Sequence, residues 1–141
     1  MIATLAERIE RLQHIEAIKQ LKYRYCAAVD ANYDAAAIAA MFTENGVWDG
    51  ADLGYAAGRA AIYQSFLEPN ATVQWMTHGV LNPIIKIDGD RAHCQWYMWL
   101  PKITDDGAGK SFQGGTHFDE CRLVEGQWYF EYMKVRLHRL P

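Results

Sequence analysis

The sequence predicts an α+β fold in which helices come first and antiparallel strands follow. Three observations favour it: apolar residues recur every three or four positions over residues 2–30, β-rich runs fill the chain from about residue 72, and Gly-containing turns separate those runs. Helices followed by a series of strands are typical of α+β domains. The chain has 141 residues, the usual length of one domain, so we expect a single domain over residues 1–141.

The first expected element is a long amphipathic helix over residues 2–30. One apolar stripe follows its axis, formed by Ile2, Leu5, Ile9, Leu12, Ile15, Ile18, Leu21 and Tyr25. Asp30 follows this stripe in "LKYRYCAAVDANYD". Such a carboxylate is usually solvent-exposed, but negative charge is unfavourable near a helix C-terminus, so Asp30 is also a candidate site residue. Tyr25 and Asp30 are about 140° apart around a straight helix, so both reach one cavity only if the helix unwinds near residues 28–30.

Two further helices and one short strand are expected before the run of strands. Asp34 is a suitable cap for a second helix, "AAAIAAMF". "GVWDG" is typical of a short strand between glycines, and "GRAAIYQSF" of a third short helix that ends before Pro69.

Two hairpins account for the remaining chain. "TVQWMTHGVLNPIIKI" and "RAHCQWYMWLPKI" flank the turn sequence "DGD", and "FQGGTHFDECRLV" and "QWYFEYMKVRL" flank Glu125–Gly126. The polar stretch "ITDDGAGKS" is expected to be the loop between the two hairpins. A strongly curved sheet wrapped around the helices would leave a cavity at its open end.

Composition excludes several classes of function. The net charge is −3 and no Lys/Arg cluster interleaves with aromatic residues, so no nucleic acid is expected as a partner. No apolar run approaches the roughly 20 residues of a membrane span, and the N-terminus is unlike a signal peptide. The cysteines Cys26, Cys94 and Cys121 are odd in number and form no C-x-x-C pair, so we expect a reducing, cytoplasmic location.

The five Trp, eight Tyr and five Phe fit either of two interpretations. They could form an aromatic core, or they could line a cavity for a ring-shaped ligand.

Three polar residues on the expected strands could act in such a cavity. His78, in "WMTHGV", would form a carboxylate–imidazole dyad if Asp30 lies opposite; otherwise it is an ordinary strand histidine. His117 shares a strand face with Gly115, Asp119, Cys121 and Leu123. Arg136 is either a surface base or a pocket residue that binds a carboxylate or carbonyl oxygen.

Other chemistries lack their usual motifs. His78, His117 and an Asp could supply two histidines and a carboxylate to a metal, but no short-spaced pair such as H-x-H supports this, so neither a metal nor a cofactor is expected. The sequence has no G-x-S-x-G elbow, P-loop or G-x-G-x-x-G.

The order of these features resembles the SnoaL-like branch of the nuclear-transport-factor-2-like (NTF2-like) superfamily. The stretches that carry the resemblance cover most of residues 8–133: "IEAIKQLKYRYCAAVDANYD", "MFTENGVWDG", "LGYAAGRAAIYQSF", "THGVLNPIIKIDGDRA" and "DECRLVEGQWYF". The implied fold is a cone-shaped α+β barrel, with three helices packed on a strongly curved, mainly antiparallel sheet that encloses a deep pocket. The resemblance also implies a homo-oligomer.

Within that family the chain is most similar to cofactor-free lyases of the scytalone dehydratase, bile-acid 7α-dehydratase and dehydrochlorinase types. By this resemblance His78 is the proton-abstracting base, Asp30 its partner carboxylate and Tyr25 a third catalytic residue. His117 and Arg136 match substrate-binding positions. A tyrosine that assists elimination in the scytalone dehydratase type is replaced by Gly50, and Trp48 is expected to fill its space.

The resemblance therefore implies a lyase that eliminates water, halide or a small aldehyde from a hydrophobic, ring-containing small molecule. Trp48 and Trp96 would hold the rings of that substrate. Two alternatives stay open: an isomerase or cyclase that uses the same residues, and a noncatalytic binding or assembly domain like the β subunit of a ring-hydroxylating dioxygenase.

Overall fold

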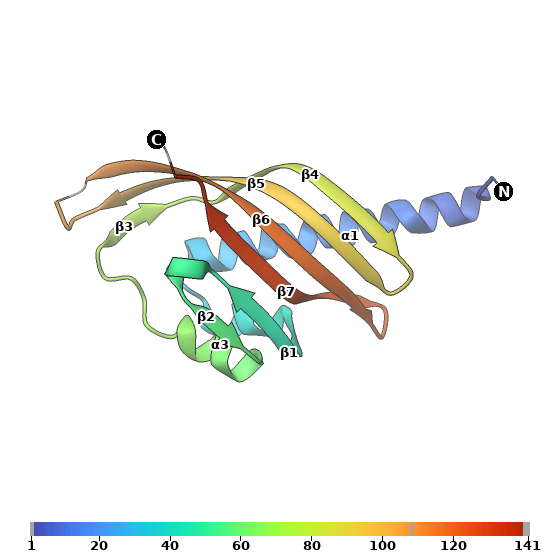
Figure 1. The fold of residues 1–141 in the computed structure, drawn as a ribbon, viewed down its shortest axis with the longest axis horizontal. Helices are drawn as coiled ribbons and strands as arrows, with labels where there is room; N and C mark the ends of the chain where they lie inside the picture. Colours follow the sequence, from blue (N-terminus) through green and yellow to red (C-terminus); the bar gives the residue numbers. More distant parts are fainter. Residues whose placement is uncertain (1, 108, 140–141) are drawn as a thin grey trace.

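The computed structural model describes residues 2–107 and 109–139, which form three α-helices and a seven-stranded sheet (Figure 1). The helices are α1 (Leu5–Asp30), α2 (Ala35–Ala40) and α3 (Arg59–Ser65), with a short 3-10 turn, η1, at Ala51–Leu53. The described helices include none that is both long and apolar enough to cross a membrane.

The long helix α1 confirms the expected first element, and its contact with the sheet begins near His14. It begins at a capping box, in which Thr4 accepts a hydrogen bond from the backbone N–H of Glu7 and the Glu7 carboxylate accepts one from the N–H of Thr4. Burial starts at Ile18, whereas Leu5 and Leu12 are exposed. The first turns of α1 extend beyond the sheet (Figure 1).

The C-terminal end of α1 corrects one expectation. The helix stays regular through Asp30 and is followed by Ala31 as its cap residue, so residues 28–30 do not unwind. Asp34 then caps α2, as predicted, by accepting a hydrogen bond from the N–H of Ala37.

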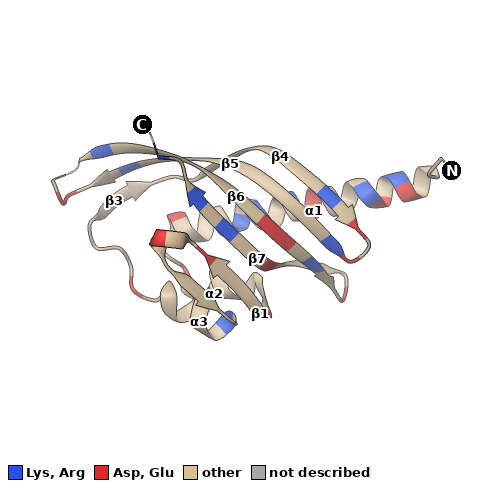
Figure 2. Cartoon of the chain, in the orientation of Figure 1, with Lys and Arg blue, Asp and Glu red and all other residues tan. Residues whose placement is uncertain are grey.

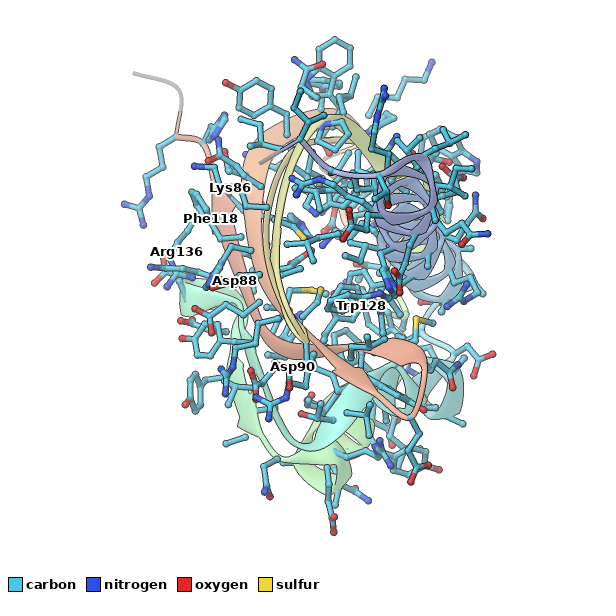
Figure 3. The ribbon with its side chains drawn as sticks, turned by 90° about the vertical axis from the view of Figure 1, so that its right-hand side faces the viewer. Lys86, Asp88, Asp90, Phe118, Trp128 and Arg136 are labelled. Atoms are coloured by element: carbon cyan, nitrogen blue, oxygen red, sulfur yellow. The ribbon has the colours of Figure 1, made fainter. Side chains whose placement is uncertain are left out.

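The sheet confirms the predicted mixture of hairpins and strong curvature. Its strands are β1 (Phe42–Asp49), β2 (Tyr55–Ala57), β3 (Val73–Met76), β4 (Gly79–Asp88), β5 (Arg91–Thr104), β6 (Lys110–Val124) and β7 (Gln127–Leu137). Their order is β2-β1-β7-β6-β5-β3, and β4 also pairs with β5. The β1–β7 pair is parallel and every other pair is antiparallel. Figure 3 shows the sheet curving around a space that α1 closes on the other side.

Two strand predictions were wrong in extent. The run over residues 72–87, expected as one strand, is divided into β3 and β4 by a break at Thr77–His78, and both parts pair with β5. The strand expected at "GVWDG" starts earlier, at Phe42, because the second helix ends at Ala40. The break at His78 is where the candidate site forms.

The core lies between α1 and the concave face of the sheet. Phe42, Phe130 and Met133 are fully buried there. Trp128 points from β7 toward α1, where its indole N–H donates to Nδ1 of His14 at 3.0 Å (Figure 3). Basic and acidic residues are interspersed along α1 and the strands in Figure 2. The apolar core thus fixes α1 against the sheet and sets the relative positions of groups on the two.

Candidate active site

A cavity of about 560 Å³ opens between the C-terminal half of α1, the helix α3 and the concave face of the sheet. Its wall is largely aromatic and aliphatic, as in most small-molecule sites. The polar groups on the wall include Tyr25, His78 and His117. Another hollow, of about 570 Å³, surrounds Gly50, Arg136 and Arg139, but it contains neither candidate histidine. The first cavity is therefore the candidate active site.

Asp30 and His78 form the dyad that the sequence suggested. The Nδ1 atom of His78 lies 2.6 Å from Oδ1 of Asp30, and the backbone N–H of His78 donates to both carboxylate oxygens at 2.9 and 3.1 Å. The Asp30 side chain is 22% exposed and that of His78 is 11% exposed. The break between β3 and β4 makes this possible, because it frees the main chain at His78 to bond to the last residue of α1.

The dyad leaves one ring nitrogen of His78 available as a base. An ionised carboxylate only accepts hydrogen bonds, so Nδ1 of His78 carries a proton, and in the neutral imidazole the lone pair is then on Nε2. His78 lines the cavity and Asp30 does not. Asp30 thus reaches the cavity only through the imidazole, which explains how Tyr25 and Asp30 serve one site from a regular helix.

Tyr25 contacts the cavity as a protonated phenol. Its hydroxyl oxygen accepts a hydrogen bond from the indole N–H of Trp48 at 3.0 Å. Burial raises the pKa of Tyr25 far above its ordinary value, and the Trp48 hydrogen bond opposes this only in part. Because the oxygen already accepts from Trp48, the Tyr25 proton can be donated to another acceptor.

Trp48 occupies the space beside Gly50. A Cβ atom built on Gly50 would lie 2.4 Å from Cη2 of the Trp48 indole. Any larger residue at position 50 therefore requires the indole to move. Trp48 is 8% exposed and lines the cavity together with Phe66, whose ring it meets edge to face at 5.2 Å.

His117 lines the cavity from β6 and is held from behind by a residue that the sequence analysis missed. Nζ of Lys22 lies 2.8 Å from Nδ1 of His117 and 2.9 Å from Oδ2 of Asp119. Lys22 is completely buried. Two features of the sequence could have indicated this pair. Lys22 lies in the apolar stripe of α1, one turn after Ile18. Asp119 lies on the same strand face as His117.

Arg136 and Trp96 do not line the cavity. Arg136 lies on the outer side of the sheet (Figure 3), where its Nη2 pairs with Oδ2 of Asp49 at 2.9 Å. This pair lowers the pKa of Asp49 and raises that of Arg136. Trp96 is 1% exposed, and its ring meets Tyr23 edge to face at 6.4 Å. No three potential metal ligands cluster together within residues 2–107 and 109–139.

Comparison with known proteins identifies the family. Residues 10–134 match the sequence model of the SnoaL-like domain. The chain belongs to the SnoaL-like family. No curated protein sequence matches this SnoaL-like chain.

Solved structures agree with this fold. A protein of Novosphingobium aromaticivorans, provisionally assigned as a scytalone dehydratase, has a TM-score of 0.83 at 22% identity, over 92% of this chain and 87% of that one. A hexachlorocyclohexane dehydrochlorinase, LinA type 2, has a TM-score of 0.85 at 14% identity, over 94% and 90%. An NTF2-like protein with a cystatin-like fold, also from N. aromaticivorans, has a TM-score of 0.78 at 20% identity, over 93% and 86%. At these identities the likeness establishes the NTF2-like fold.

Proposed function

We propose that this SnoaL-like protein is a cofactor-independent lyase that eliminates water or another small group, such as halide or a small aldehyde, from a bulky ring-containing molecule. The observation that carries the proposal is the Asp30–His78 pair at the wall of a largely apolar cavity. The named activities of the two enzyme-type structures above, dehydratase and dehydrochlorinase, are both eliminations.

In the proposed reaction, Nε2 of His78 removes a proton from a carbon of the substrate. For loss of water or halide, the electron pair of that C–H bond forms the new double bond, and the leaving group departs with its own bonding pair. For loss of a small aldehyde, Nε2 instead removes the proton of a substrate hydroxyl. The O–H pair then forms the aldehyde C=O bond, and the pair of the broken C–C bond stays on the remaining substrate as an enolate or phenolate. Asp30 holds the imidazole in place and stabilises its positive charge. A positioned general base of this kind contributes roughly 10²- to 10⁴-fold to the rate.

Tyr25 would support the same step as a hydrogen-bond donor on the cavity wall. Its O–H would donate a hydrogen bond to a departing hydroxyl or to a developing enolate or phenolate oxygen. Such a preorganised donor contributes on the order of 10²-fold or more, because its position needs no adjustment as charge develops. Trp48 fixes the Tyr25 oxygen, and its indole face contributes to the apolar wall against which substrate rings would pack.

The proposal can be tested with a panel of ring-fused β-hydroxy ketones and of chlorinated cyclohexanes, followed by mass spectrometry. We expect a product that has lost the mass of water or of hydrogen chloride. A product of unchanged mass would instead assign an isomerase or cyclase to the same residues. Absence of turnover across the panel, with binding retained, would favour a noncatalytic domain.

A further inference from the structure

Lys22 and Asp119 form a fully buried ion pair directly behind the cavity wall. Lys22 extends from α1 and Asp119 from β6, and their side chains are 0% and 1% exposed. Nζ of Lys22 lies 2.9 and 3.2 Å from the two Asp119 oxygens. A buried pair of this type contributes little net stability, because desolvation of two charges offsets their attraction. The contact of this pair with His117 on the cavity wall points to a role other than stability.

The Lys22 ammonium group contacts two polar side chains and two aromatic rings. One N–H is directed at Asp119 and another at Nδ1 of His117, at 2.8 Å. The rings of Tyr25 and Phe130 lie 5.2 and 5.4 Å from Nζ, within the range of cation–π contact. Burial raises the pKa of Asp119 above its ordinary value. The charge of Lys22, the Lys22 hydrogen bond and the Trp96 indole oppose this rise only in part. Lys22 is therefore held in one position, with a donor aimed at His117.

This contact determines the tautomer of His117. An ammonium group only donates, so Nδ1 of His117 must accept and the single ring proton of the neutral imidazole resides on Nε2. Burial, the Lys22 charge and His78 lower the pKa of His117 well below 6.5, so the ring is neutral. Nε2 lies 3.3 Å from the sulfur of Met98, which also lines the cavity. A thioether is a weak acceptor, and a carbonyl or phenolic oxygen is a much stronger one.

We propose that Lys22 and Asp119 are positioning residues that lock His117 as a neutral Nε2–H donor, and that this donor recognises a carbonyl, enolate or phenolate oxygen on the substrate. The idea rests on the proposed function, since it assigns the substrate an oxygen next to the reacting carbon. A neutral donor suits the site because a second imidazolium near His78 would oppose protonation of the base.

The tautomer is measured directly on the intact protein labelled with ¹⁵N-histidine, using long-range ¹H–¹⁵N correlation spectra. We expect His117 to show a protonated Nε2 and an unprotonated Nδ1 from pH 5.5 to 8. A protonated Nδ1, or a doubly protonated ring near neutral pH, would overturn the proposal. This readout needs no variant and no substrate.

Variants then test whether Lys22 and Asp119 impose the tautomer. Lys22→Met/Asp119→Leu replaces the ion pair by apolar side chains of similar size, a change that buried pairs often tolerate. We expect the His117 signals to change to a mixture of both tautomers. Lys19→Met makes the same chemical change on the same helix and should leave the spectrum unaltered. An unchanged Nε2–H tautomer in a folded double variant would refute the positioning role.

Oxygen recognition is tested by the binding of 1-naphthol, measured by titration. His117→Gln places an amide N–H near the position of Nε2 and should bind within about threefold of the original protein, whereas His117→Phe should bind roughly tenfold more weakly. Equal affinities in both variants would argue against oxygen recognition. Naphthol binding needs no turnover. Failure of the His117 proposal would therefore appear in the binding titrations, and failure of the lyase proposal in the product analysis.

Discussion

His117 illustrates how burial fixes the protonation of one residue and links it to the stability of the protein. Its folded pKa is lowered well below 6.5, first by burial and then by the Lys22 charge and the nearby His78. In the unfolded chain the ring titrates near its ordinary value. Below about pH 6.5 the unfolded state therefore binds a proton that the folded state does not, and stability falls as the pH falls.

We predict that His117→Gln removes this acid sensitivity. The urea midpoint of the original protein should fall between pH 7.5 and 5.5 more steeply than that of the variant. The free energies of unfolding of the two proteins should diverge by at most about 1.4 kcal/mol per pH unit, which is the value for the binding of one proton. His93→Gln, at an exposed position, is the matched control and should track the original protein. Parallel curves for the original protein and His117→Gln would show that His117 titrates normally in the folded state.

The dyad is also tested residue by residue, once a substrate is found. We expect His78→Ala to lower kcat by roughly 10²- to 10⁴-fold, because it removes the base. Asp30→Asn should also lower kcat, because an amide can present a donor to Nδ1 and stabilises the wrong tautomer. His93→Ala should retain full activity, since His93 lies outside the cavity wall. Near-original rates in folded His78→Ala and Asp30→Asn would exclude the dyad mechanism.

At the scale of elements, the break between β3 and β4 is the feature that assembles the site. The backbone N–H of His78 bonds to Asp30 instead of to a neighbouring strand. A hydrogen bond to a charged group contributes about 1.5–3 kcal/mol to stability. The end of α1 is therefore bonded to the main chain at His78, between β3 and β4.

We predict that Asp30→Ala destabilises the protein by roughly 2 kcal/mol and loosens this junction. Hydrogen exchange should speed up at the amides of His78 and Gly79 more than at those in the centre of β5. Asp34→Ala removes another carboxylate, the cap of α2, and should cost about 1 kcal/mol without changing exchange at His78. Equal exchange at His78 in both variants would mean that Asp30 does not hold the junction.

The same elements show which parts of the fold a sequence can reveal. Turn positions were predictable, because Gly89 and Gly126 have positive φ angles of 59° and 80° between β-rich runs. Strand alternation also places Arg136 opposite the inward-facing Val135 and Leu137, so its position outside the cavity follows from local pattern alone. The resemblance to the SnoaL-like family had instead suggested that Arg136 binds substrate in the pocket.

The break at His78 and the burial of Lys22 could not be predicted from local pattern. Each depends on a partner far away in the chain: Asp30 is 48 residues before His78, and Asp119 is 97 residues after Lys22. A lysine on an apolar stripe is compatible with either a solvated helix face or a buried pair. Only the packing of α1 on β6 decides between them.

At the scale of the whole molecule, two apolar surfaces remain exposed. The outer face of β5 and β6 presents Tyr97, Trp99 and Phe118, each more than 40% exposed, and Figure 3 shows Phe118 on that outer side. The protruding first turns of α1 expose Leu5 and Leu12. Exposed apolar surface often marks an interface when it forms large patches.

We therefore predict a homo-oligomer, measured by light scattering during size-exclusion chromatography. Trp99→Glu should shift the mass toward that of the 16.1 kDa monomer, because it places a charge in the outer apolar face. Leu67→Glu, at an exposed position after α3, should leave the mass unchanged. A monomeric original protein at micromolar concentration would contradict this prediction.

The single helix α1 supplies Lys22, Tyr25 and Asp30, whereas the two histidines that they contact lie on β6 and at the break between β3 and β4. The positions of all these side chains relative to the cavity therefore depend on how α1 packs against the sheet. His14 of α1 and Trp128 of β7 bond to each other far from the cavity. A substitution of either residue that tilts α1 would disturb the contacts of Lys22, Tyr25 and Asp30 with the two histidines together. Substitutions between α1 and β7 therefore offer a way to change the proposed activity without altering any residue of the cavity wall.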